Sequence, residues 1–357
     1  MKFKINMIAL CVLSLPIISY AQAPKQQNKN FKRFSISAGW LHAMPQGSGN
    51  PFNNQTAVAE GTQSKVGEVS KSAVLDAAVK DSNPFIYGTI SIFPGQDLPA
   101  ALSGTANING LSSWQSANTG LEANTADTLG IMMNYYLNDH WSVEIKAGIP
   151  PTVDLNGKGT VYAPLRGSNK PSLSVFSADI PLGGSIDLHQ DIHVTDLSQG
   201  SKTASVRAWL PAFELHYQFG QSGVNKFRPY VGAGLLYGYF DKVKLNSGIE
   251  SDLILAAHRI QNILDNKAGA GLDGKISSAS PLVKVKATQA YAPIVTVGAT
   301  YDFTDKWYAV GSISYSQMNT EAKITVTDGN TGNQLIRSKT KVDIDPIITY
   351  VGMGYRF

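Results

Sequence analysis

The chain ends in Ile347-Ile348-Thr349-Tyr350-Val351-Gly352-Met353-Gly354-Tyr355-Arg356-Phe357, an alternating stretch whose last residue is aromatic. Successive side chains of a β-strand point to opposite faces, so one face of this stretch is apolar and aromatic. The other face is mostly small and ends in Arg356. A closing strand with an apolar outward face and a small or polar inward face is typical of an outer-membrane β-barrel. We expect Met353, Tyr355 and Phe357 to form the signal that barrel-assembly machinery reads.

The N-terminus carries the pattern of a secretory signal. Lys2 and Lys4 precede an apolar run over 5–18, and Ser19-Tyr20-Ala21 places small residues at the −3 and −1 positions. The run is short for a membrane-spanning helix, so the pattern predicts a signal peptide over residues 1–21 and a mature chain over 22–357. The single cysteine, Cys11, lies inside the predicted signal, so we expect no disulfide in the mature chain.

Eight segments alternate between apolar residues and small or polar ones. They cover 34–40, 128–137, 141–149, 209–219, 231–239, 291–303, 307–316 and 347–357. Bacterial outer-membrane barrels use an even number of antiparallel strands, and no segment after the signal is apolar enough for a transmembrane helix. We therefore predict an all-β fold, an eight-stranded antiparallel transmembrane β-barrel in the outer membrane of a Gram-negative bacterium.

The connections between these segments alternate in length. Short turns fall at Asn138-Asp139-His140, Gly220–Lys226 and 304–306, long connections cover about 43–123, 162–203 and 245–288, and the last, near 327–335, is shorter. Short turns on one side and long loops on the other mark the periplasmic and extracellular ends of a barrel. A secreted β-sandwich is the alternative, but it explains neither this alternation nor the terminal Phe357.

Charged residues on the inward face lie near the short-turn ends. By the alternation, the inward set is Glu144, Lys146, Glu214, His216 and Arg356. An eight-stranded barrel has room for little but its own side chains, and an unpaired buried charge is costly. We therefore predict that these residues pair into a polar plug in the periplasmic half of the lumen. A proton relay through Glu214 and His216 is the functional alternative.

Higher in the barrel the inward residues become small or apolar. They are Gly232, Gly234, Leu236, Gly298, Ile348, Tyr350 and Gly352. A run of small inward residues predicts a lumen cavity that is open to the outside. The alternative is that the glycines only accommodate strand coiling and tilt.

The third long connection carries a helical pattern. Ser247-Gly248-Ile249-Glu250 matches a capping box, and apolar residues recur at helical spacing from Ile249 to Leu264. We predict that this loop is partly helical, with an apolar face for which three roles are open: capping the barrel mouth, lying on the outer leaflet, or, as is more common, packing against other loop residues. Residues 69–79 of the first connection predict a second helix.

One stretch of the second connection is a candidate metal site. His189, Asp191 and His193 alternate, so on a strand all three would face one side. Only three ligands are present and the stretch lies in a predicted loop, so we interpret it as a solvated strand extension and predict no metal. We also predict no cofactor. The sequence shows no phosphate loop, nucleophile motif or nucleic-acid patch.

Several short segments of the predicted strands form a characteristic set. They are Trp209-Leu210-Pro211, Phe227–Gly234, Tyr301-Asp302-Phe303, Asp345-Pro346 and Gly354-Tyr355-Arg356-Phe357. Together they resemble the OmpW family of small outer-membrane barrels over most of the strands and little of the long loops. The resemblance implies a narrow, largely hydrophobic lumen and a role in the passage of small hydrophobic molecules. This chain departs from the family in its enlarged loops.

Three functions are compatible with these patterns. The first is passive passage of small hydrophobic solutes, which a plugged lumen would force sideways into the outer-membrane lipid. The second is a closed structural or adhesive barrel whose loops bind a surface partner. The third is a membrane-embedded enzyme, which we do not expect because His216, the one histidine found on the predicted wall, points inward near the periplasm.

Overall fold

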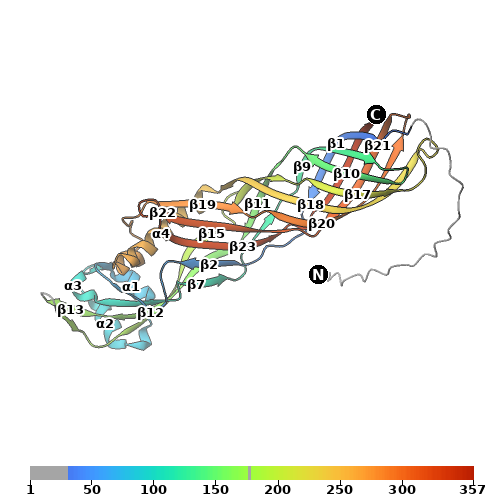
Figure 1. Cartoon of the computed structure of the whole chain (residues 1–357). Helices are drawn as coiled ribbons and strands as arrows, with labels where there is room; N and C mark the ends of the chain where they lie inside the picture. Colours follow the sequence, from blue (N-terminus) through green and yellow to red (C-terminus); the bar gives the residue numbers. More distant parts are fainter. Residues whose placement is uncertain (1–30, 176–177) are drawn as a thin grey trace.

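The protein is an elongated β-structure with a barrel at one end and a second folded region beyond it (Figure 1). The computed structural model describes residues 31–175 and 178–357, so the predicted signal peptide over 1–21 lies outside the described residues. We call the second region the head and define it as the parts that connect barrel strands on the long-connection side, over 45–125, 149–211, 246–289 and 317–346.

Eight antiparallel strands close the barrel, as predicted. They are β1 (Phe34–Met44), β9 (Ala126–Tyr136), β10 (Trp141–Gly148), β17 (Ala212–Gln218), β18 (Phe227–Leu245), β20 (Ala290–Asp302), β21 (Trp307–Ser316) and β24 (Ile347–Arg356). The hydrogen-bonded order is β17-β10-β9-β1-β24-β21-β20-β18, and pairing of β17 with β18 completes the circle.

The alternation assigns the two faces of the wall correctly. Outward side chains such as Phe213, Val297 and Met353 are 56–58% exposed, whereas Glu214 and Thr296, one residue away from the first two, are at most 2% exposed. Lipid surrounds the outside, so the exposed face is apolar. The short turns lie where they were predicted, and Phe357 ends beside the first strand, with its backbone N–H donating to the Phe34 carbonyl at 2.9 Å.

The long connections are folded, which differs from the prediction of loops. The first contains β2 (Phe52–Thr56), β3 (Thr62–Lys65), β4 (Val69–Ser70), α1 (Lys71–Ala77), η1 (Lys80–Ser82), α2 (Pro84–Ile92), β5 (Asp97–Leu98), α3 (Ala100–Ser103), β6 (Thr105–Asn109), β7 (Ser113–Ser116) and β8 (Gly120–Ala123). The second contains β11 (Thr152–Lys158), β12 (Thr160–Lys170), β13 (Ser172–Val175), β14 (Ala178–Pro181), β15 (Ile186–Asp196) and β16 (Ala204–Trp209). It begins well before residue 162, the predicted boundary.

The other two connections complete the head. The third contains α4 (Ser247–Leu264), α5 (Ala268–Leu272) and β19 (Pro281–Ala287), and the fourth is the hairpin of β22 (Asn319–Asp328) and β23 (Gln334–Asp343). The main head sheets have the orders β19-β22-β23-β2-β7 and β15-β12-β6-β3, while β16, β11 and β8 continue the barrel sheet beside the outer part of β18. One apolar core fills the head and reaches the barrel mouth at Leu236, Ile294 and Ile348.

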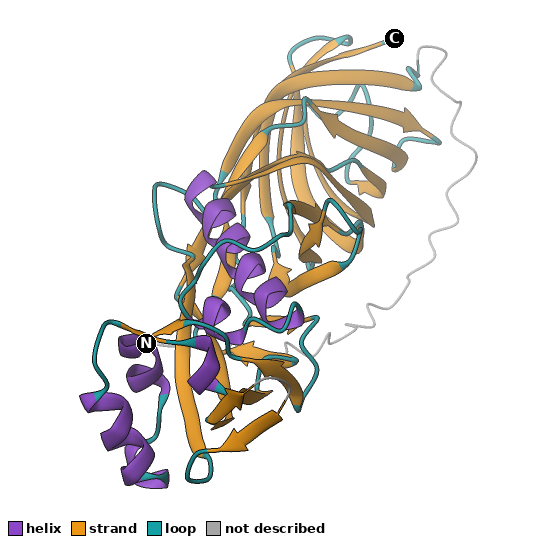
Figure 2. Cartoon of the chain, turned by 90° about the vertical axis from the view of Figure 1, so that its left-hand side faces the viewer, coloured by secondary structure: helices purple, strands orange, loops and turns teal. Residues whose placement is uncertain are grey.

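All helices of the described residues belong to the head (Figure 2). Helix α4 has the predicted extent, but its N-cap is Asn246, whose side chain accepts from the Gly248 N–H, and not Ser247. Its apolar face packs on the head core through Ile249, Leu253 and Ile260. In the described residues, no helix combines the length and the hydropathy that crossing a membrane requires.

Candidate functional site

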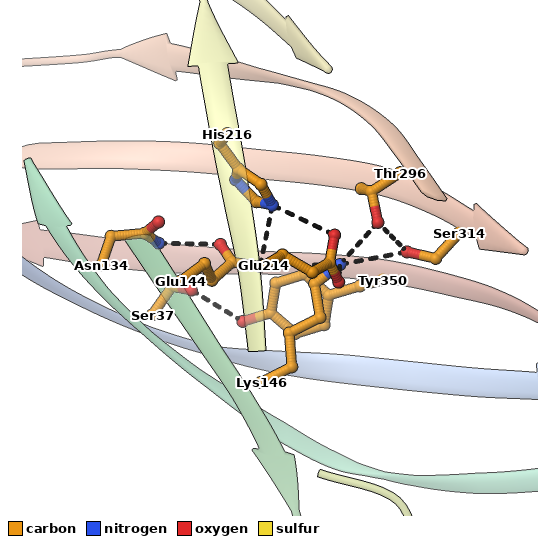
Figure 3. A network of polar contacts seen from close by, with 9 residues as sticks. All are labelled: Ser37, Asn134, Glu144, Lys146, Glu214, His216, Thr296, Ser314 and Tyr350. Carbon is orange, nitrogen blue, oxygen red and sulfur yellow. Dashed lines mark hydrogen bonds and ion pairs between the residues drawn. The ribbon is translucent and has the colours of Figure 1, made fainter. Parts of the chain in front are cut away.

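A network of paired charges lies inside the barrel (Figure 3). Lys146 Nζ lies 2.7 Å from Glu214 Oε1 and 3.6 Å from Glu144 Oε1, and it donates to Thr296 and Ser314 at 3.0 Å. His216 Nε2 lies 3.2 Å from Glu214 Oε2. Strands β10, β17, β20 and β21 therefore meet through one ammonium group.

The network is tightly packed and anchored to neighbouring strands. Asn134 on β9 donates to Glu144 Oε2 at 2.8 Å, and the His216 ring stacks on Tyr230 of β18 with centroids 4.8 Å apart. The nearest lumen cavity measures about 10 Å³, which is room for at most one water molecule. These contacts close the barrel to a continuous water path in this structure.

Arg356 lies apart from this network. Its guanidinium pairs with Asp302 at 2.7 Å and covers the Tyr308 ring at 4.3 Å. Arg228, 1% exposed, donates to the carbonyls of Phe219, Gly220 and Asp139 and so ties two periplasmic turns together. The predicted plug thus consists of a central cluster and a separate layer of arginines. The role of Arg228 had been missed, although its inward position follows from the same alternation.

The glycines of the upper lumen do not line a cavity, which differs from the prediction. Tyr230 lies opposite Gly298 in the strand register, and a Cβ atom on Gly298 would collide with that ring. His216 covers Gly232 in the same way, and the Tyr350 ring bends back over Gly352. Bulky rings therefore occupy the space that the glycines leave open.

The first sizeable cavity lies one layer further out, at the mouth. It measures about 130 Å³, and Lys146 forms part of its floor. Its wall is otherwise mostly apolar and includes Leu41, Leu210, Phe240, Met318 and Ile348. Of the residues predicted to line a lumen cavity, Ile348 lines this one, whereas Leu236 is 1% exposed within the packed core.

The mouth cavity reaches an interruption of the barrel wall. The last barrel pair between β10 and β17 is Lys146 with Ala212, and the next pair in the same direction is Thr152 with Arg207. Pro150, Pro151 and Pro211 lie between these pairs and have no N–H to donate to a ladder. Among the described residues, a hydrogen bond from Ala208 N to the Pro151 carbonyl, 3.0 Å long, bridges the two sides here. We call the segments 147–151 and 208–211 the side window.

Both faces of one strand line the cavity at this window. Lys146 and Gly148 belong to the inward face of β10, and Ala147 belongs to its outward side. Ile149, the residue that follows the strand, also lines the cavity and is 59% exposed. The sequence analysis assigned Trp209-Leu210-Pro211 to a strand and did not identify the window. The prolines were the available signal, because a proline within an alternating run marks a ladder interruption.

The three residues considered as a metal site lie on an exposed strand face and do not converge on one point. His189, Asp191 and His193 do share the exposed face of β15, and Asp191 pairs with Arg166 at 3.2 Å. Within 31–175 and 178–357, the set of three potential ligands that converges to 4.8 Å is Glu144, Glu214 and His216. There the Lys146 ammonium already lies against both carboxylates.

His216 is not the one histidine on the barrel wall, which corrects the sequence analysis. Strand β1 extends to Met44, so His42 also belongs to the wall. Its Nδ1 lies 2.7 Å from Asp127, which also accepts from Trp40 at 2.7 Å. This cluster lies near the outer end of β1, away from the plug.

The fold and the site together define an outer-membrane β-barrel protein. Residues 98–280 and 269–357 match the model of the OmpW family, and the chain belongs to that family. Outer membrane protein W of Vibrio cholerae serotype O1 is 23% identical over 237 residues, which cover 66% of this chain and 76% of that protein. The protein is accordingly placed in the outer membrane of a Gram-negative bacterium, in contact with its lipid.

Two solved structures are also similar. OprG from Pseudomonas aeruginosa is 16% identical with a TM-score of 0.49, and the match covers 91% of this chain and 96% of OprG. AlkL in lipid bilayers is 13% identical with a TM-score of 0.39, and the match covers 94% of this chain and 96% of AlkL.

Proposed function

We propose that this barrel provides passive passage for small hydrophobic molecules, which enter at the head and leave sideways through the side window into the bilayer. The observation that carries the proposal is that one mostly apolar cavity touches both the inward and the outward side of β10, at Gly148 and Ala147. A solute in this cavity needs no path through the plug to reach lipid.

The size and chemistry of the cavity define the solute class. An apolar cavity of about 150 Å³ accommodates benzene, so the 130 Å³ at the mouth is comparable to, and slightly smaller than, the space for one small ring. An ion would find few groups to replace its hydration and would meet Lys146 at the floor. The plug supplies closure and no chemical step in this proposal.

Filling the window tests the proposal. Ala147→Phe and Ala208→Phe each place a ring where a cavity-lining methyl group now lies, and the double variant should reduce entry of radiolabelled toluene several-fold into cells that carry the protein. Ala309→Phe is the matched control, because Ala309 lies on the outward face of β21 and lines neither apolar cavity. Equal surface amounts of the three proteins are verified by gel shift on heating.

The same test separates passage from the alternative function. If toluene entry is unchanged in the filled variant, the side-exit proposal is wrong, and a closed barrel whose head binds a surface partner becomes the better account. Gly234→Leu and Gly352→Leu are unsuitable for filling, because new side chains would meet the Phe213 carbonyl and the Tyr350 ring.

We also propose that Met353, Tyr355 and Phe357 direct assembly. Phe357 and Met353 are 67% and 56% exposed on the outward face, and Tyr355 contacts Phe357 with ring centroids 5.1 Å apart. Deletion of Phe357 should lower the amount of folded barrel in the membrane without changing toluene entry per folded molecule. Normal membrane levels of the truncated chain would contradict this role.

A further inference from the structure

The head sheet of β19, β22, β23, β2 and β7 has two different faces. Its inner face covers an apolar cavity of about 300 Å³, which also contacts α4 and the β12–β15 sheet and shares Ile249 with the mouth cavity. We call this the head cavity. The outer face of the sheet continues the barrel wall, because β19, β22 and β23 are joined to β20, β21 and β24 (Figure 1). The proposed passage does not use this outer face.

Basic side chains concentrate on the outer face of the head sheet. Burial alternates along β19, β22 and β23, and the outward positions hold six cations and two carboxylates. They are Lys284, Lys286, Lys323, Arg337, Lys339, Lys341, Glu321 and Asp343. The formal net charge of the whole chain is +4, so the excess of cations on this one face equals the net charge of the protein.

Three of these lysines lie directly opposite one another. The strand register pairs Lys286 with Lys323 and Lys323 with Lys339, so the three form one row across β19, β22 and β23. We call it the lysine row. Like charges directly opposite on neighbouring strands destabilise a sheet. Lysines on sheet edges prevent aggregation, but β22 and β23 lie inside this sheet, so edge protection does not explain the row.

Much of this positive charge is not neutralised by neighbouring carboxylates. The two carboxylates of the face already pair with lysines of β23, at N···O distances of 3.1 and 2.9 Å. Within residues 31–175 and 178–357, no carboxylate lies within 4.0 Å of the Nζ atom of Lys286 or Lys323. These two facing ammonium groups are therefore available to an external anion.

The spacing and the neighbours of the row favour a phosphorylated sugar. Adjacent strands lie about 4.7–4.9 Å apart, so one phosphate group can contact two facing lysines. A phosphate carries about 1.5–2 negative charges near pH 7 and balances both. The row continues with Asn53 and Gln115, whose amide groups pair with sugar hydroxyls. Surfaces for single-stranded nucleic acid add aromatic side chains, whereas Phe52 and Trp114 of these strands line the head cavity.

The lysine row lies beyond the lipid-facing part of the wall. Tyr291 of β20 and Tyr315 of β21 are 73% and 45% exposed on the outward face, as is typical of residues at the membrane interface. Lys286 and Lys323 are five and eight residues away from these rings along the chain. At about 3.3 Å per residue, the row is roughly 17–26 Å from the rings along the strands. Sugars attached to the outer leaflet would meet this face from the side.

We propose that the outer face of the head sheet binds the phosphorylated sugars of lipopolysaccharide in the surrounding outer leaflet. Lipopolysaccharide is the main lipid of that leaflet in Gram-negative bacteria, and its sugars carry phosphate groups. Basic residues beside a membrane attract anionic head groups. The lipid anchor holds this ligand next to the wall, so its effective concentration is high. The inference goes beyond passage, because it requires neither the side window nor the plug.

Protection of individual lysines from acetylation tests the contact. Full-length protein is placed in phosphatidylcholine nanodiscs with increasing amounts of rough-type lipopolysaccharide, or of the same lipopolysaccharide after dephosphorylation. Acetylation by acetic anhydride is followed by mass spectrometry. We expect the phosphorylated lipid to slow acetylation of Lys286 and Lys323 several-fold and the dephosphorylated lipid to leave it unchanged. Lys65 and Lys170, which are exposed on the other head sheet, are the internal controls.

Lys286→Gln combined with Lys323→Gln tests the lysine row itself. Removing two facing like charges from the surface favours the sheet, so the variant should fold. Each basic residue near an anionic membrane surface strengthens binding by about fivefold, so half-protection of Lys284 should require at least about tenfold more lipopolysaccharide. Lys65→Gln combined with Lys170→Gln changes the net charge equally and should leave half-protection of Lys284 unchanged.

Three results would overturn the proposal. Equal protection by the phosphorylated and the dephosphorylated lipid would show that phosphate is not recognised. Unchanged half-protection in the Lys286→Gln and Lys323→Gln double variant would show that the row is not the site. If soluble heparin protects the row and lipopolysaccharide does not, the partner is a soluble sulfated polysaccharide. Toluene entry is not measured here, so failure of the passage proposal would not produce any of these results.

Discussion

The barrel and the head are both β-structures whose strands alternate between an inward and an outward face. The chemistry of the two faces is reversed: the inward face is polar in the barrel and apolar in the head. In the barrel, β21 points Ser312 and Ser314 inward and Ile313 outward; in the head, its continuation β22 points Ile324 inward and Lys323 outward. The change takes place across the few residues 317–318 that join them. The outward face follows the surrounding solvent, which is lipid around the barrel and water around the head.

The composition of the interior depends on how much space each region encloses. An eight-stranded barrel has little room, and paired charges with stacked rings fill it. The head is wide enough for two sheets and helix α4 to enclose an apolar core, and its cavities lie within that core. Apolar binding is therefore expected in the head and mouth, and closure in the barrel. The following substitutions probe this division from the largest expected effect to the smallest.

Lys146→Met should destabilise the barrel most. It leaves Glu144 and Glu214 buried without their cation, at 2% and 0% exposed, and breaking a buried ion pair costs about 3–5 kcal/mol. The measurement is urea unfolding from lipid vesicles, with Lys341→Met in the head as the control, because the Lys341 side chain is 55% exposed. Equal stability of the two variants would mean that the plug residues are hydrated.

Ile249→Ala should destabilise the head and spare the barrel. Ile249 is 0% exposed and lines both apolar cavities, and such truncations cost about 2–5 kcal/mol. Hydrogen exchange should accelerate in α4 and the head sheets and remain slow in β20 and β21. Ser251→Ala, on the exposed side of α4, is the matched control. Faster exchange throughout the barrel would show that the two regions unfold together.

An outward arginine should be tolerated in the head and not in the barrel. Val297 is 58% exposed midway along β20, where an arginine facing the bilayer centre costs about 2–4 kcal/mol. Thr327→Arg on the corresponding face of β22 should change stability by less than about 0.5 kcal/mol. Both variants are compared by unfolding from vesicles. A similar loss of stability at both positions would contradict the claim that lipid surrounds the barrel and water surrounds the head.

The smallest expected effect is a pH dependence confined to the head. Hydrogen bonds from Ser280 N, Thr331 Oγ1 and Asn330 N hold the pKa of the Asp328 carboxyl below its ordinary value of 3.8. A carboxyl group whose pKa is lowered by folding stabilises the folded state at pH values above its unfolded-state pKa. This stabilisation is lost as the pH falls through the folded-state pKa. Exchange at residues 329–333 should therefore accelerate below about pH 4, and Asp328→Asn should remove that dependence. Equal protection of residues 329–333 from hydrogen exchange at pH 3 and pH 6 would refute this prediction.

Local alternation predicted the barrel well because the membrane enforces it. Each of the eight segments contains one barrel strand with the predicted faces, although the strand in 209–219 begins only at Ala212. The clustering of Glu144, Lys146, Glu214 and His216 followed from inward position and charge alone. The separation of Arg356 did not follow, because its partner Asp302 lies on another strand end.

The remaining features depend on contacts between distant segments. The rings over Gly232 and Gly298 come from neighbouring strands, so a run of small inward residues was not enough to predict a void. The strands of the head were missed although 319–328 alternates as regularly as the barrel segments, because its outward face is polar and charged and not apolar. The head cavity required the packing of α4 on two sheets.

The central claim is that the lumen below the mouth is closed, so that apolar solutes must leave sideways. Single-channel recording of the purified full-length protein in planar bilayers tests this claim most directly. The account predicts no steady ion conductance for the wild type, because Lys146, its two carboxylates and the stacked rings fill the cross-section. A large, steady, ohmic conductance would show an open water path and would contradict it.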